Sequence, residues 1–108
     1  MKFKENINKI HYLLSNNFED ISILEKTNLK YGNYIELSIN EGNKKFISII
    51  RKVDLENNKF NWLYMSNPSS EESYLIERNS SLDNFHNDVK DIFDKNRFDS
   101  DYIKNLDQ

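Results

Sequence analysis

The spacing of apolar side chains switches twice along the chain, and this switch constrains the fold more than any other feature. Apolar residues recur every three or four positions over residues 2–17 and again over residues 82–93, whereas over residues 34–39 they alternate with polar ones. The longer spacing indicates a helix with one apolar side, and the alternation indicates a half-buried strand. The chain therefore predicts helices at both ends and a sheet between them.

The first helix is expected over residues 2–17, ending near Asn16 because Asn tolerates a left-handed backbone. Residues 40–43 and 54–58 predict turns, and the segment around Pro68 predicts a loop. Five segments between the first helix, these turns and this loop are predicted to form strands, namely 21–23, 34–39, 44–53, 60–66 and 74–78. The third of them has apolar residues on both faces, which predicts a central position in the sheet.

The last quarter of the chain returns to a helical spacing. A helix is expected after Ser80 or Ser81, both good N-cap residues, and a further short helix is expected over residues 98–106. Helices covering one face of an antiparallel meander form an α+β fold. We therefore expect a single domain over residues 1–108: an N-terminal helix, a four- to five-stranded, mostly antiparallel sheet, and one or two C-terminal helices on one face.

The composition excludes several kinds of chemistry. The chain has no Cys, which excludes disulfides, thiolate nucleophiles and Cys-based metal sites. It has no glycine-rich phosphate loop, nucleophile elbow, zinc-protease His motif or calcium loop. No metal, cofactor or enzymatic activity is therefore expected. No apolar run is long enough to cross a bilayer and the N-terminus lacks a secretory signal, so a cytoplasmic location is expected.

Charge is distributed unevenly along the sequence. The net charge is −3, and the seven Asp and four basic residues of positions 81–108 account for all of it. Domains that bind phosphates usually carry a basic excess instead. This acidic excess favours a protein partner with a basic surface. Direct contact with nucleic acid is the less favoured alternative, and no membrane binding is expected.

The first candidate binding surface is a row of acidic and amide side chains on the polar side of the last long helix. Carboxylates three positions apart on a helix lie about 5–6 Å from one another, close to the spacing of backbone phosphates along a strand. Such a row is suited to a basic groove on another macromolecule, although an ordinary solvated helix face has the same pattern. Its members are Asn84, Asn87, Asp88, Asp91 and Asp94.

A second candidate is the aromatic alternation of Phe60, Trp62 and Tyr64, whose side chains lie on one face of a strand. We expect these rings to form the core beneath the helices, because large aromatic residues contribute most to burial. The alternative is that Trp62 and Tyr64 are exposed, where they would stack on RNA bases or anchor a protein partner.

Basic residues flank the predicted central hairpin and form a third candidate surface. The group could contact RNA or an acidic protein, but lysines also protect sheet edges from aggregation, and that is the simpler interpretation. Its members are Lys44, Lys45, Arg51 and Lys52.

The two histidines, His11 and His86, lie on different predicted helices and share no short motif. His86 has Asp83 and Asp88 nearby in sequence, which predicts no more than a local pairing of these side chains on the surface. A catalytic site requires its groups to lie within hydrogen-bond reach of one another, and the sequence gives no such arrangement for either histidine. Neither is therefore assigned a catalytic or metal-binding role.

In size, acidic composition and element order the chain resembles the small inhibitors carried by phages and mobile elements, including anti-CRISPR proteins. The resemblance implies a non-enzymatic protein that blocks a nuclease or ribonucleoprotein through an acidic surface. Toxin-neutralising immunity proteins are similar in the same respects and are one alternative. An RNA-binding module that uses the basic strand and exposed aromatics is another, and a secretion chaperone whose sheet accepts an extended segment is a third.

Overall fold

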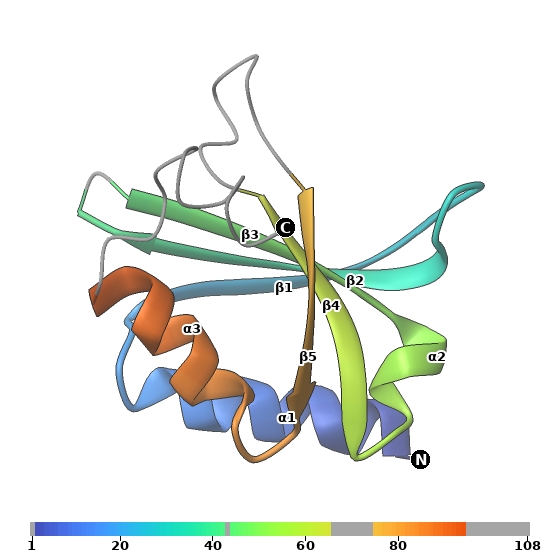
Figure 1. The fold of residues 1–108 in the computed structure, drawn as a ribbon, viewed down its shortest axis with the longest axis horizontal. Coiled ribbons are helices and arrows are strands. Elements are labelled where there is room, and N and C mark those ends of the chain that lie inside the picture. The colour runs from blue at the N-terminus through green and yellow to red at the C-terminus, as the bar shows by residue number, and fades with distance from the viewer. Residues whose placement is uncertain (1, 43, 66–74, 95–108) are drawn as a thin grey trace.

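The computed structural model describes residues 2–42, 44–65 and 75–94, and shows an antiparallel sheet with helices before, within and after it (Figure 1). The five strands follow one another across the sheet in the order β1-β2-β3-β4-β5. The elements are α1 (Lys2–Ser15), β1 (Asp20–Asn28), β2 (Gly32–Glu41), β3 (Lys44–Arg51), α2 (Lys52–Leu55), β4 (Lys59–Met65), β5 (Leu75–Ser81) and α3 (Phe85–Asp94).

Two hairpins with glycine turns build one half of the sheet. Gly42 has a φ of +61° between β2 and β3, and Gly32 has a φ of +68° at the start of β2. These are left-handed conformations that glycine adopts without strain. The β1–β2 turn is further held by Asn28, whose side-chain oxygen accepts a hydrogen bond from the Tyr31 amide at 2.7 Å.

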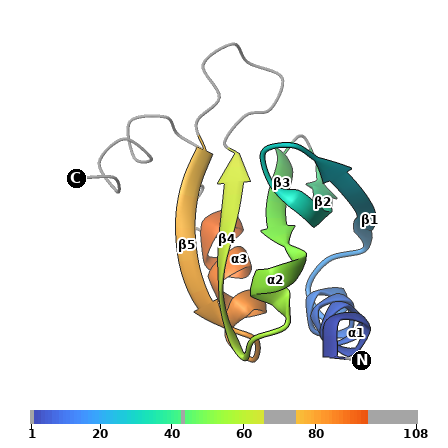
Figure 2. The same cartoon turned by 90° about the vertical axis from the view of Figure 1, so that its right-hand side faces the viewer.

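Helices α1 and α3 lie on one face of the sheet, and the core fills the space between these two layers (Figure 2). Alternate residues of β2, β3 and β4 point into this layer and are fully buried, as the alternation in the sequence predicts. We call this side the helix-covered face. The other side, on which none of the described helices packs, is the helix-free face. The core strand residues are Ile35, Leu37, Ile39, Phe46, Ile50, Phe60, Trp62 and Tyr64.

The α+β prediction is confirmed, including helices on one face and the central position of β3. The predicted 44–53 strand is too long, because the chain turns after Arg51 into the short helix α2. Arg51 pairs with Asp54 across this turn at 2.6 Å, and Leu55 is fully buried. Asn6 of α1 then holds α2 by donating a hydrogen bond from Nδ2 to the Leu55 carbonyl at 2.5 Å.

The predicted start of the last long helix is wrong by several residues. Ser80 and Ser81 are the final residues of β5, and α3 begins at Phe85. Ser81 still assists the approach to the helix, since its Oγ accepts a hydrogen bond from the Asn84 amide at 3.2 Å. Ser80 is instead buried beneath α3. The short helix predicted over residues 98–106 lies outside the described residues.

Removal of the Phe85 ring should lower the free energy of unfolding by about 3–5 kcal/mol, because a fully buried aromatic side chain leaves a cavity. The Phe85 ring lies 4.9 Å from that of Trp62 and 5.4 Å from that of Phe60, centroid to centroid. Urea unfolding of Phe85→Ala, followed by circular dichroism, measures this loss. Leu29→Ala, at a fully exposed position, is the control and should change it by less than about 0.5 kcal/mol. Equally small losses in both variants would contradict the packing of α3.

Candidate functional site

Helix α3 packs on the sheet with its apolar side and has its polar side directed outward. Four of its residues are buried against the sheet, namely Phe85, Val89, Ile92 and Phe93. On the opposite side Asn87 and Asp94 are exposed and Asp91 is half-buried, with Asn84 exposed just before the helix. We call Asn84, Asn87, Asp91 and Asp94 the α3 ridge. These four predicted site residues therefore share one outward surface.

Asp88, the fifth residue of the predicted row, has a different environment. It is half-buried, and one carboxylate oxygen, Oδ2, accepts a hydrogen bond from the Ser80 hydroxyl. The same Ser80 oxygen accepts a hydrogen bond from the Trp62 indole Nε1 at 2.8 Å. The chain Trp62–Ser80–Asp88 thus links β4, β5 and α3 and satisfies polar groups beneath the helix. Sequence reasoning missed this role of Ser80, because a Ser before a helix has the same pattern as an N-cap.

The C-terminal half of α3 combines negative groups with a cation from the sheet. Asp91 and Asp94 lie in the last turn of the described helix, which contains no basic residue. Lys44 of β3 donates a hydrogen bond from Nζ to the Phe93 carbonyl at 3.4 Å, and Lys90 Nζ lies 3.9 Å from Asp94. Lys44 thus places a cation beside a backbone carbonyl of α3 and connects the helix to β3.

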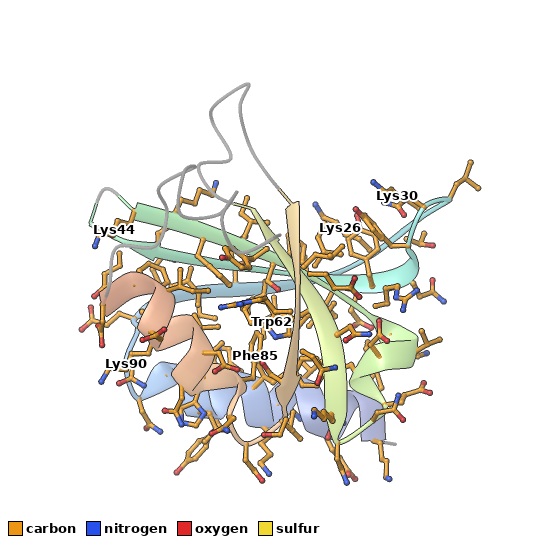
Figure 3. The ribbon with its side chains drawn as sticks, in the orientation of Figure 1. Lys26, Lys30, Lys44, Trp62, Phe85 and Lys90 are labelled. Atoms are coloured by element: carbon orange, nitrogen blue, oxygen red, sulfur yellow. The ribbon has the colours of Figure 1, made fainter. Side chains whose placement is uncertain are left out.

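The predicted basic group does not form one patch. Lys44 and Lys45 lie at the start of β3 and Arg51 and Lys52 at its end, which separates the pairs by about 20 Å at the usual rise of a strand. Lys44 contacts α3 as described above, and Figure 3 shows it far from the other end of the strand. Arg51 forms a two-point pair with Asp54, and Lys52 Nζ lies 5.1 Å from the centre of the Phe3 ring.

The exposed-aromatic alternative for Trp62 and Tyr64 is wrong. Their exposed fractions are 1% and 0%, and Figure 3 shows Trp62 between the sheet and the helices beside Phe85. Phe46 from β3 stacks near Tyr64 with 6.0 Å between ring centres. These rings face the helix-covered side, where they exclude water from the core, so they are not accessible to bases.

The two histidines lie on different helices, α1 and α3. His11 is exposed on α1, with the Ser15 hydroxyl 3.5 Å from its Nδ1. His86 is half-buried on α3, and its Nδ1 is a buried atom without a hydrogen-bond partner. Within the described ranges no three His, Cys, Asp or Glu residues come close enough to hold a metal ion.

The helix-free face carries a hollow of about 260 Å³ beside the tip of the β1–β2 hairpin. Ile49 and Leu63 provide apolar lining, and the charged residues around them come from four different segments. The register aligns Leu24, Glu36, Ile49, Leu63 and Glu77 in one row across all five strands. The apolar residues on both sides of β3 were a signal for this surface, and of its charged members only Arg51 was a predicted site residue. The charged lining residues are Lys30, Arg51, Asp54 and Glu77.

Three ion pairs shift the pKa of one partner each. Lys9 of α1 lies 2.6 Å from Asp83, just before α3, and this hydrogen-bonded cation lowers the pKa of the Asp83 carboxyl. Glu36 accepts from Lys26 at 2.7 Å and raises the pKa of that lysine. Asp54 likewise accepts a hydrogen bond from Arg51 and raises the pKa of that guanidinium group. The Lys9–Asp83 pair is the one that ties α1 to the segment entering α3.

No protein-family model, curated protein or solved structure matches the chain. None of the helices in the described ranges is long and apolar enough to cross a membrane. The assignment of a function therefore starts from the geometry of α3 and of the sheet. Of the predicted surfaces, only the α3 ridge brings its residues together on one outward side.

Loss of the Ser80 hydroxyl should lower the free energy of unfolding by about 1–3 kcal/mol, because Trp62 Nε1 loses its acceptor and Asp88 loses its donor below α3. Urea unfolding of Ser80→Ala measures this. Ser22→Ala, on the exposed part of β1, makes the same chemical change and should cost less than about 0.5 kcal/mol. A Ser80→Ala protein as stable as Ser22→Ala would contradict the role of this link.

The Lys9–Asp83 pair should stabilise the fold at neutral pH and cease to do so in acid. The pKa of Asp83 is lower in the folded protein than its ordinary value of 3.8, so the ionised carboxylate favours folding. Its contribution is complete above the unfolded pKa and disappears as the pH falls through the folded one. The effect is small, since both groups are exposed.

Thermal melts of wild type and Asp83→Asn from about pH 7 to about pH 2 test this dependence. The two melting temperatures should differ at neutral pH and begin to converge only as the pH falls below 3.8, because the pKa of Asp83 in the folded protein lies below that ordinary value. In a Lys9→Met background the Asp83→Asn change should have little effect at any pH. A constant difference across the range would contradict the pair.

Proposed function

We propose that this chain is a small, non-enzymatic, protein-binding inhibitor of the kind carried by phages and mobile elements, including anti-CRISPR proteins. It acts on a nuclease or ribonucleoprotein by placing the α3 ridge in a basic surface of the target, such as a channel that otherwise holds nucleic acid. The observation that carries this proposal is the rigid outward presentation of Asp91 and Asp94 on a helix whose other side is buried.

Rigidity matters because a charged surface gains affinity only if it is not reorganised on binding. The four buried side chains of α3 fix the helix, so the Cβ atoms of Asp91 and Asp94 keep the separation of about 5–6 Å that is usual three positions apart. A groove that binds successive phosphates presents cations at a similar spacing. The ridge therefore offers such a groove a matched set of negative groups without a sugar or base.

The alternatives differ in how well the described geometry accommodates them. An immunity protein would use the same ridge against a nuclease toxin, so it differs from the leading proposal only in the target. An RNA-binding role has less support, since the basic residues lie at both ends of β3 and the aromatic rings are buried. A chaperone would require a sheet surface that accepts an extended segment.

Inhibition assays on a panel of RNA-guided nucleases and nuclease toxins test the proposal. The wild-type chain should block cleavage by at least one of them. The Asp91→Lys/Asp94→Lys variant should raise the inhibition constant by about tenfold or more at low salt, since it places like charges in a basic site. The difference should shrink as the ionic strength rises.

The control variant Glu56→Lys/Glu77→Lys makes the same change in net charge at two exposed residues away from α3 and should inhibit like wild type. Circular dichroism of both variants establishes that they are folded. A panel in which no enzyme is inhibited, or a control variant that is weakened as much as the ridge variant, would contradict the proposed function.

A further inference from the structure

Strand β1 forms one edge of the sheet and pairs with another strand, β2, on one side only. Its nine residues, Asp20–Asn28, pair with β2 in an unbroken antiparallel register. Within the described residues no strand lies on its other side, so half of its N–H and C=O groups are not used by the sheet. A long, regular edge of this kind is a template for the addition of another strand.

Several of the devices that block an edge strand are missing from β1, although Glu25 places one charge on its helix-covered side. It contains neither Pro nor Gly, and the unbroken pairing with β2 leaves no bulge. Its one lysine, Lys26, is held by Glu36 of β2 at 2.7 Å. Leu24, on the helix-free face, is 50% exposed although it is a large apolar residue. The edge is therefore competent to pair.

A groove runs beside this edge on the helix-covered side. It lies between α1 and β1 and has a volume of about 360 Å³. Its apolar lining includes Ile7, Ile21 and Ile23, which are only partly buried, and its other lining residues are Asn8, His11, Leu24 and Glu25. Figure 2 shows α1 beside β1 at this border of the sheet. An added strand would place alternate side chains over this groove and complete the burial of the three isoleucines.

We propose that the occupant is a second copy of this chain, which adds its own β1 antiparallel to the first across a two-fold axis at Ile23. In this register Ile23 faces Ile23 of the second copy on the helix-covered side, and on the same side Ile21 faces Glu25 of the second copy at the border of the groove. Asp20 faces Lys26 of the second copy on the helix-free side, and the symmetry creates this pair twice. The two five-stranded sheets thereby become one continuous sheet.

Charge complementarity selects this register from its neighbours. An axis at Glu25 would place Glu25 against Glu25, which is unfavourable for directly opposite residues. An axis at Leu24 would oppose Lys26 to Ser22 and leave no pair of unlike charges. Only the axis at Ile23 matches both exposed charges of the helix-free side, Asp20 and Lys26, with opposite ones. An interface between identical surfaces must be self-complementary in this way.

Sedimentation equilibrium of the full chain over a range of concentrations tests the dimer. The wild type should dimerise, and Asp20→Lys or Lys26→Glu alone should raise the dimer dissociation constant by about tenfold or more, since each places two like-charge pairs in the interface. An equimolar mixture of the two variants should restore the dimer, because in a mixed pair every charge faces an opposite one.

Glu41→Lys and Lys59→Glu make the same charge changes away from β1 and should leave dimerisation unchanged. Circular dichroism of each single variant establishes its fold. A wild type that stays monomeric, single variants that still dimerise like wild type, or a mixture that forms no mixed dimer would each overturn the proposal. None of these results depends on a target of the α3 ridge.

Discussion

Everything else in the structure depends on a layer of aromatic rings between the sheet and the helices. The chain contains no Ala and only two Val, so its core has few small residues with which to bring helix and sheet close together. Rings from β3, β4 and α3 fill the space instead, with Phe46, Trp62 and Phe85 at its centre. Tilted and edge-on contacts between large rings fix the position of α3, and with it the direction of every side chain on the helix's outer side.

The periodicity of the sequence predicted which residues belong to this layer, because helical and strand spacing each determine a side of an element. Burial of Phe60, Trp62 and Tyr64 followed from the alternation and from the size of the rings. The short helix α2 and the end of β5 were not predictable in this way. They depend on tertiary partners, such as the Leu55 carbonyl that binds Asn6 and the Ser80 hydroxyl between Trp62 and Asp88. Local propensity contains no information on such contacts.

The same limit applies to the charged candidates. Helical spacing placed Asp88, Asp91 and Asp94 on one polar side, but it gave no indication that β5 offers a hydroxyl to Asp88 alone. The basic residues near β3 are close in sequence, but the two ends of this extended strand are about 20 Å apart. The two pairs of basic residues are therefore far from each other in the folded protein. A helix gathers residues three or four positions apart, whereas a strand disperses them. The acids of α3 therefore form a surface, and the bases of β3 do not.

The two proposed surfaces use different groups of the protein. Pairing through β1 uses the backbone of an edge strand, whereas the α3 ridge is the outward side of a helix whose buried side packs on the sheet and, through Phe93, on Phe18. A dimer formed through β1 would carry two α3 ridges related by the two-fold axis. For a target with two basic sites within reach, the second contact would form at an effective concentration on the order of millimolar. Modest electrostatic affinity at each ridge would then suffice for tight binding, which fits a surface with few carboxylates.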